Sequence, residues 1–127
     1  MEKPNVTKFV NVDVELRSKR SLAKLGAHLR DVSFVLSSEK FFVAFEATFD
    51  PGTPDETIRA LVTIVEALPV QLRDAWNQCE SRYFDIGIEA GTRPPAGAFE
   101  LSGETIRLLA SVRGEIRITV YPPTAAD

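Results

Sequence analysis

The sequence is poor in the residues that most often hold metals or form disulfides. Its 127 residues include one cysteine, Cys79, and one histidine, His28. One cysteine excludes an internal disulfide framework, and a zinc site needs several cysteine or histidine ligands. No segment approaches the roughly 18 apolar residues of a membrane helix, and the N-terminal stretch lacks the apolar run of a signal peptide. We therefore expect a cytoplasmic protein with no metal site and no membrane segment.

A strong excess of either charge is also missing. The chain has 15 basic and 18 acidic residues, which gives a formal net charge of −3. A nucleic-acid-binding protein usually has a basic excess, so no general nucleic-acid binding is expected. The chain also lacks phosphate-binding and dinucleotide-binding glycine motifs and a nucleophile elbow. The sequence therefore predicts no cofactor and favours a protein that is not an enzyme.

His28 and Cys79 both have ordinary structural explanations. His28 precedes Leu29 on a predicted helix, where a surface or boundary imidazole is more common than a general base. Cys79 lies near Trp76, and without a partnering base it is expected to be a buried, inert thiol rather than a nucleophile. One alternative stays open, namely a small-molecule-binding or enzymatic pocket between helices and sheet near Trp76 and Cys79.

Hydrophobic periodicity predicts the order β-α-β-β-α-α-β-α-β. Alternation of apolar and polar residues predicts five strands, over residues 9–16, 32–36, 41–49, 83–89 and 116–120. Apolar residues at helical spacing predict four helices, over residues 22–29, 54–68, 70–82 and 103–110. Predicted N-caps are Ser18 or Ser21 for the first helix, Thr53 for the second and Ser102 for the last.

This pattern predicts one α+β domain over residues 1–121, followed by a flexible C-terminal tail at 122–127. The domain should have two layers, with about five mainly antiparallel strands and helices on one face, because one-faced alternation is typical of such sheets. Segments 17–36 and 101–120 also align at a constant shift. The alignment fits an internal strand-helix-strand duplication, and it equally fits any two regularly packed units.

The stretch RYFDIGIEAG, residues 82–91, places two carboxylates on the polar face of a strand. Asp85 and Glu89 are four residues apart, so their Cα atoms lie about 13 Å apart, beyond the roughly 5–9.5 Å of a glycosidase pair. A carboxylate on a neighbouring strand would be closer. Gly87, between the two, predicts a notch without a side chain, where a partner could approach.

The polar face of the predicted sheet gathers carboxylates and both tyrosines of the chain. Tyrosine is enriched at protein interfaces, and carboxylates steer and orient a basic partner. An ordinary solvated face is the alternative interpretation, and a homodimer closed through this face is another. The predicted partner-binding residues are Asp13, Glu15, Glu46, Tyr83, Asp85, Glu89 and Tyr121.

Several segments resemble a known family over about residues 12–122. They read VELRSKRSLAKL, DETIRALVTIVEALP, FDIGIEAG, FELSGETIRLLA and IRITVYP. The family consists of small bacterial proteins that carry a domain of unknown function, number four-two-seven-nine. The resemblance rests mainly on hydrophobic patterning, and it implies a compact α+β bacterial protein without catalytic residues to transfer.

Size, charge and patterning are also similar to those of immunity proteins, which neutralise toxins of neighbouring cells. The leading hypothesis is therefore a non-enzymatic protein-binding module. In its most specific form, this is an immunity protein that blocks a basic toxin domain through the acidic and aromatic sheet face. The pocket near Trp76 and Cys79 and a structural homodimer remain as alternatives.

Overall fold

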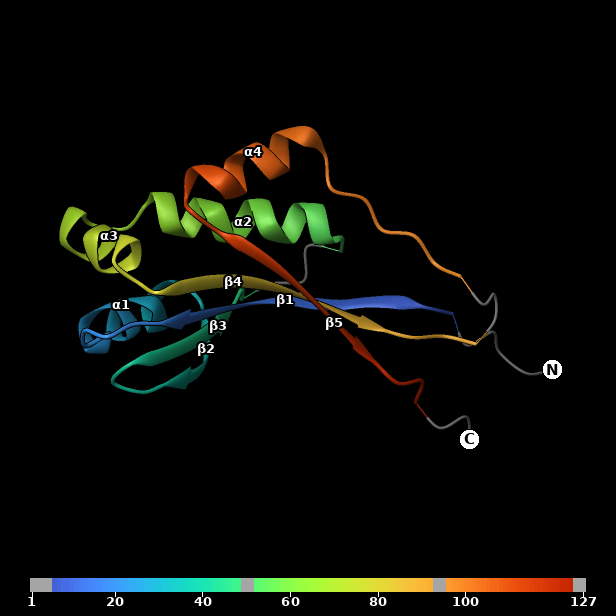
Figure 1. Cartoon of the computed structure of the whole chain (residues 1–127), viewed down its shortest axis with the longest axis horizontal. Coiled ribbons are helices and arrows are strands. Elements are labelled where there is room, and N and C mark those ends of the chain that lie inside the picture. The colour runs from blue at the N-terminus through green and yellow to red at the C-terminus, as the bar shows by residue number, and fades with distance from the viewer. Residues whose placement is uncertain (1–5, 49–51, 93–95, 125–127) are drawn as a thin grey trace.

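A computed structural model of the chain describes residues 6–48, 52–92 and 96–124 (Figure 1). Within these described ranges, five strands and four helices follow one another in the predicted order. The elements are β1 Lys8–Arg17, α1 Ala23–Val32, β2 Phe34–Ser38, β3 Phe42–Glu46, α2 Pro54–Glu66, α3 Val70–Asn77, β4 Ser81–Glu89, α4 Gly103–Ser111 and β5 Glu115–Tyr121. The predicted tail at 122–127 lies partly outside the described residues, as does the end of the predicted strand at Phe49.

The five strands form one sheet in the order β2-β3-β1-β4-β5. β1 is antiparallel to β3 and β4, and β2 is antiparallel to β3. Only β5 joins in parallel, beside β4, which the α4 crossover between these two strands allows. The predicted α+β fold with two layers and a mainly antiparallel sheet is therefore confirmed.

The helices pack on one face of this sheet, and the core lies between the two layers (Figure 1). Alternate residues of β1 and β4, such as Val14 and Phe84, are fully buried on that face. Trp76 of α3 packs edge-on against Phe84, and its indole N–H donates to the carbonyl of Val112 at 2.8 Å. In the part of the chain that the structure covers, no helix is both long and apolar enough to cross a bilayer.

The two later helix starts follow the prediction. The Thr53 side chain accepts the backbone N–H of Glu56 at the start of α2, and the Ser102 side chain accepts that of Thr105 at the start of α4. A side-chain oxygen at the N-cap stabilises a helix because the first N–H groups have no partner within it. The predicted separation of the second and third helices is also present, with Pro69 between α2 and α3.

The first helix start differs from the prediction. Leu22 is the N-cap of α1 and its side chain makes no capping hydrogen bond, although the Ser21 hydroxyl accepts the backbone N–H of Ala23 at 3.3 Å. Ser18 instead accepts the backbone N–H of Arg20 in a local turn. The Leu22 backbone N–H donates to the carbonyl of Lys40 at 2.7 Å, so a long-range contact to the β2–β3 hairpin fixes this start.

β2 is a strand as predicted, but the apolar residues Val32, Phe34 and Leu36, whose alternation predicted it, do not form its buried face. Val32 ends α1, Phe34 pairs with Glu46 on the side away from the helices, and Val35 packs against the core. An irregularity in the ladder between Val35 and Ser37 leaves Leu36 exposed. A one-residue change in register moves every side chain to the other face, and a bulge changes the alternation again.

The two strand-helix-strand units share their connectivity but not their residue environments. In both, the helix connects strands that run in the same direction, adjacent in β4-α4-β5 but separated by β3 in β1-α1-β2. The aligned residues Leu22 and Ile106 are 1% and 52% exposed. Phe34 points away from the helices, whereas its aligned residue Ile118 lies on the helix side. The residue-by-residue correspondence therefore does not hold in three dimensions.

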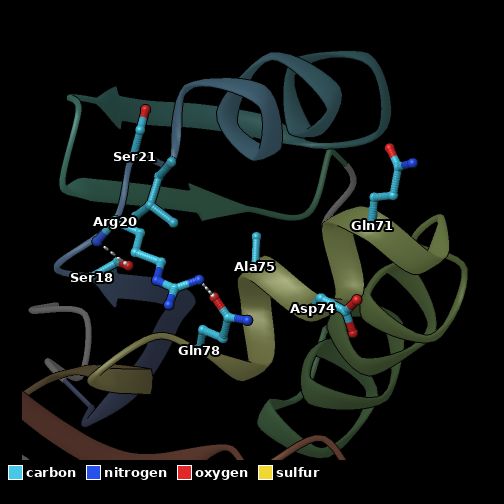
Figure 2. A pocket seen from close by; sticks show the side chains of 8 residues that line it. Ser18, Arg20, Ser21, Gln71, Asp74, Ala75 and Gln78 are labelled. Carbon is cyan, nitrogen blue, oxygen red and sulfur yellow. Dashed lines mark hydrogen bonds between the residues drawn. The ribbon is translucent and has the colours of Figure 1, made fainter.

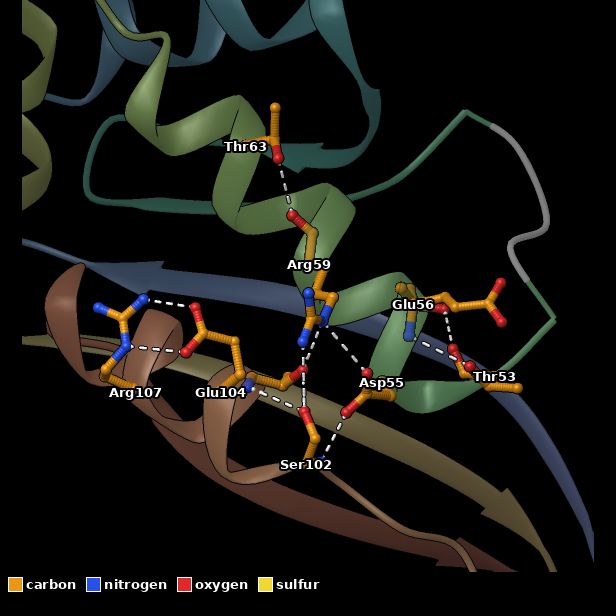
Figure 3. A network of polar contacts seen from close by, with 10 residues as sticks. Thr53, Asp55, Glu56, Arg59, Thr63, Ser102, Glu104 and Arg107 are labelled. Atoms are coloured by element: carbon orange, nitrogen blue, oxygen red, sulfur yellow. Dashed lines mark hydrogen bonds and ion pairs between the residues drawn. The ribbon is translucent and has the colours of Figure 1, made fainter.

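A polar clamp joins the N-termini of α2 and α4 (Figure 3). An Asp55 carboxylate oxygen accepts the backbone N–H of Ser102 at 2.7 Å, which lowers the pKa of Asp55. Arg59 Nε donates to the Thr105 hydroxyl at 2.8 Å and lies 3.3 Å from the second Asp55 oxygen. The clamp fixes α4 beside α2, and thereby the point from which the chain enters β5.

Candidate functional site on the outer sheet face

All of the predicted partner-binding residues lie on the outer face, which is the sheet face away from the helices. Asp13 and Glu15 alternate with the buried Val12, Val14 and Leu16 along β1. The ladders place the others level with them or farther along the same face, since directly paired residues point to the same side of a sheet. The set consists of Asp13, Glu15, Glu46, Tyr83, Asp85, Glu89 and Tyr121.

Three carboxylates stand side by side across the middle of this face. Asp13 of β1 pairs directly with Asp85 of β4. The pairing of Val14 with Phe45 places Glu46 of β3 on the other side of Asp13. We call Glu46, Asp13 and Asp85 the carboxylate row. Like charges directly opposite each other destabilise a sheet, so this row costs folding free energy unless protons or cations relieve the repulsion.

Arg117 of β5 provides that relief at one end of the row. Its Nη1 lies 3.1 Å from a Glu15 oxygen and 3.7 Å from an Asp85 oxygen. The Thr119 hydroxyl donates to Asp85 at 2.7 Å. The guanidinium also stacks 4.2 Å above the Tyr83 ring, and its hydrogen bond to Glu15 is the main reason that its pKa is raised. Four of these side chains thus form one compact group around Arg117.

The other end of the row has no such cation. Asn11 donates to Glu46 at 2.9 Å, and Glu46 stands beside the Asp13 carboxyl and helps to raise its pKa. Burial, which is the largest cause, and the neighbouring Glu46, Asp85 and Glu15 together raise the pKa of Asp13 to about 7. Within residues 6–48, 52–92 and 96–124, no lysine or arginine forms an ion pair with Asp13 or Glu46. Asp13 therefore keeps its proton up to near-neutral pH.

Glu89 and Tyr121 lie apart from this group, toward the other end of β4. The Lys8 ammonium lies 3.3 Å from a Glu89 oxygen. The Tyr121 ring comes within 3.4 Å of the position that a Cβ atom on Gly87 would occupy, and Val10 lies 3.7 Å from it. The notch predicted at Gly87 is therefore filled by the chain's own side chains, and that expectation was wrong.

Sequence reasoning missed Arg117, Thr119 and Asn11, which hold the carboxylates in place. Strand alternation puts all three on the outer face, so that part of the signal was available. The missing information was the parallel pairing of β5 with β4, which sets Arg117 opposite Asp85. Neither strand order nor register can be read from a single sequence.

The alternative pocket near Trp76 and Cys79 is not supported by the packing there. Trp76 is fully buried and Cys79 is 6% exposed. The thiol donates to the carbonyl of Ala75, and burial raises its pKa to about 11. A thiol with so high a pKa is a poor nucleophile near pH 7, as expected for an inert cysteine.

A surface pocket of about 230 Å³ lies nearby, between the β1–α1 connection and α3 (Figure 2). Neither Trp76 nor Cys79 lines it. Its lining includes Gln71, Asp74 and Gln78, and Arg20, which also lines it, donates to Gln78 at 2.9 Å. Among the described residues, the side-chain hydrogen bonds within the lining join Arg20 to Ser18 and to Gln78, and none joins a serine to Asp74 as a nucleophile–base pair requires.

The carboxylate row can bind a proton or a cation. Metal binding and acid–base catalysis are the two kinds of chemistry that such a row could support. Among the described residues, no group of three His, Cys, Asp or Glu side chains is placed to hold a metal ion. A carboxyl with a pKa near 7 beside a second carboxylate also fits a general acid–base pair. Such a pair needs a concave site that surrounds the substrate, whereas this row lies on the sheet face that no helix covers.

Comparison with protein families, with curated proteins and with solved structures gave no match for this chain. The resemblance to the family with the domain of unknown function therefore stays a prediction. What the chain does must be argued from its own surfaces.

Proposed function

We propose that the chain is a non-enzymatic, cytoplasmic protein-binding module that docks a basic protein on its outer sheet face. The observation that carries the proposal is the Asp13–Glu46 pair, which has no lysine or arginine partner in the described part of the chain. A lysine or arginine of a partner, placed over this pair, would displace the proton that Asp13 holds near neutral pH. The carboxylates of the row, which repel one another in the free chain, would then attract the positive charge of the partner across the interface.

Aromatic side chains beside the row supply contact area for such a partner. Phe34 stands next to Glu46 in the ladder and is 56% exposed, and Tyr121 is 48% exposed at the opposite edge. Phe42 lies under the guanidinium of Arg17, 4.8 Å from it. Aromatic and arginine side chains are the residues that most often carry binding energy at interfaces. Charge at the centre with aromatic flanks fits a protein partner better than a small ligand.

An immunity protein is the specific form of this function that we propose. The chain would then block the basic active site of a toxin domain by steric occlusion, with charge complementarity speeding the encounter. The small size, the mild negative charge and the resemblance to small bacterial proteins support this form. A toxin gene next to the gene for this chain would identify the partner to test.

The charge requirement can be tested before a natural partner is known, with an oligolysine peptide in a calorimetric titration. The double variant Asp13→Asn, Glu46→Gln should bind it roughly tenfold more weakly, because it loses the uncompensated pair. In the wild type, binding near pH 7 should release a proton, so the measured heat should depend on the ionisation enthalpy of the buffer.

The matched control is Glu39→Gln, Glu66→Gln, which neutralises two exposed carboxylates away from the outer face and so removes at least as much charge. It should bind the peptide like the wild type, apart from a small general charge effect. If both double variants lose affinity equally, the row has no special role and the proposal fails.

A further inference from the structure

The edge of the sheet formed by β5 lacks the features that usually prevent edge strands from pairing. β5 is seven residues long, and its register with β4 is continuous from Tyr83–Glu115 to Glu89–Tyr121. It contains no proline and no irregularity. Natural edge strands are normally short, bulged, or interrupted by proline or inward-pointing charges. The opposite edge follows that rule, since β2 has five residues and an irregular ladder.

An apolar strip follows this edge on the helix side, although the core lies on that same side. Ile116, Ile118 and Val120 pair with buried residues of β4, yet they are 41%, 61% and 63% exposed. We call these three residues the β5 strip. An open groove of about 250 Å³ continues it beneath Phe99 and Leu101. Contiguous exposed apolar surface of this kind marks an interaction site.

The backbone of the β5 strip also faces the open edge. The Tyr121 carbonyl accepts the N–H of Ala90, so the Tyr121 backbone turns toward β4. Because the N–H and C=O groups of successive strand residues turn to opposite sides, Ile116, Ile118 and Val120 direct theirs outward. Within the described residues, no other strand pairs with this edge.

These features fit a second copy of the same strand, running antiparallel about a two-fold axis at Ile118. Ile118 of one copy then faces Ile118 of the partner subunit, and Ile116 faces Val120 of the partner subunit. All the outward backbone groups of the β5 strip are used, because each such pair exchanges two hydrogen bonds. The apolar side chains of the two strips meet on one face.

The outer-face charges select this register over its neighbours. With the axis at Ile118, Arg117 lies opposite Thr119 of the partner subunit. A shift of the axis to position 117 would set the two Arg117 residues directly opposite each other, which is unfavourable. A shift to position 119 would set Ile116 opposite Pro122 of the partner subunit, and proline has no N–H to donate.

We infer that the chain forms a two-fold homodimer through antiparallel pairing of its β5 strands, which joins two sheets into one. Both helix layers then lie on one side of the joined sheet, and both carboxylate rows lie on the other. The dimer uses the backbone edge and the β5 strip rather than the carboxylate row, so it does not rest on the function proposed above.

Light scattering after size-exclusion chromatography tests the dimer on the full chain over a concentration series. The wild type should approach twice its chain mass of 14.0 kDa. Ile118→Lys should raise the dissociation constant roughly a hundredfold or more, because the two lysines would meet at the axis. The fold should survive this change, since Ile118 is already 61% exposed.

Leu36→Lys is the matched control, because Leu36 is 46% exposed on the opposite edge strand. It should leave the dimer intact. For the register, Ile118→Cys in a Cys79→Ala background should form an intermolecular disulfide on mild oxidation, and Leu36→Cys should not. A wild type that stays monomeric at all concentrations would overturn the inference. A dimer that survives Ile118→Lys but is lost in Leu36→Lys would do the same.

Discussion

Asp13 shows how one residue can connect the fold to the proposed binding site. It lies half-buried between Glu46 and Asp85, and its pKa is raised from 3.8 to about 7. Its ionised form is therefore disfavoured in the folded chain relative to the unfolded chain. Natural sequences usually avoid such unfavourable local choices except where function requires them. Because the neighbouring carboxylates disfavour the ionised form of Asp13, a positively charged partner placed there would stabilise it.

The first prediction concerns stability as a function of pH. The folded state holds the Asp13 proton more tightly than the unfolded state, so stability should fall as pH rises from about 4 to about 7. The change from 3.8 to about 7 corresponds to about 4 kcal/mol at 1.36 kcal/mol per pKa unit. Solvent screening at this half-buried group reduces the effect to about 2 kcal/mol. Urea unfolding at a series of pH values measures it.

Asp13→Asn should remove most of this dependence. The variant should match the wild type near pH 4 and exceed its unfolding free energy by about 1–2 kcal/mol at pH 8, because the buried charge is gone. Asp31→Asn, at an exposed position on α1, should leave the pH profile unchanged. If the unfolding free energies of the wild type and Asp13→Asn depend on pH in the same way, Asp13 is not the cause of the pH dependence.

At the scale of elements, the α2–α4 clamp predicts that the Ser102 cap contributes more to stability than the Thr53 cap. The Ser102 hydroxyl caps α4, contacts the Thr105 hydroxyl at 3.0 Å and lies 3.4 Å from Arg59 Nη2. The hydroxyl of Thr53 caps only its own helix. Ser102→Ala should therefore cost about 1–2 kcal/mol and Thr53→Ala about 1 kcal/mol.

Thermal unfolding of the two cap variants checks this order, with Ser111→Ala as reference. Ser111 is exposed near the end of α4 and bonds only the carbonyl of Leu108, so its loss should cost under about 0.5 kcal/mol. Equal costs for Ser102→Ala and Thr53→Ala would mean that the contacts between the two helices add nothing to the cap.

Most elements could be predicted from the sequence because their signals are local. The alternation in 83–89 and the caps Thr53 and Ser102 needed only neighbouring residues. The start of α1 and the face of β2 could not be predicted, since each depends on contacts with the β2–β3 hairpin. The site shows the same limit. Alternation placed its carboxylates on one face, whereas only the register shows that Arg117 neutralises one end of the row and not the other.

At the scale of the whole molecule, a single core connects both layers. Buried residues of all four helices belong to one cluster with buried residues of β1, β3 and β4. Trp76 lies inside that cluster and is the only tryptophan, so its fluorescence reports on the core. Far-UV circular dichroism reports on helices and strands throughout the chain. The two signals together can show whether residues 1–121 behave as one domain.

We predict that both signals follow one urea transition, because a shared core gives cooperative, two-state unfolding in a chain of this size. The slope should be about 1–3 kcal/mol per molar urea. Labelling of Cys79 by a thiol reagent should rise with the same midpoint, since the buried thiol is protected only in the folded state. Ile118→Lys is the suitable background, because dimerisation would make the midpoint depend on concentration. A circular dichroism transition that precedes the fluorescence transition would reveal a separately unfolding part, which contradicts a single domain.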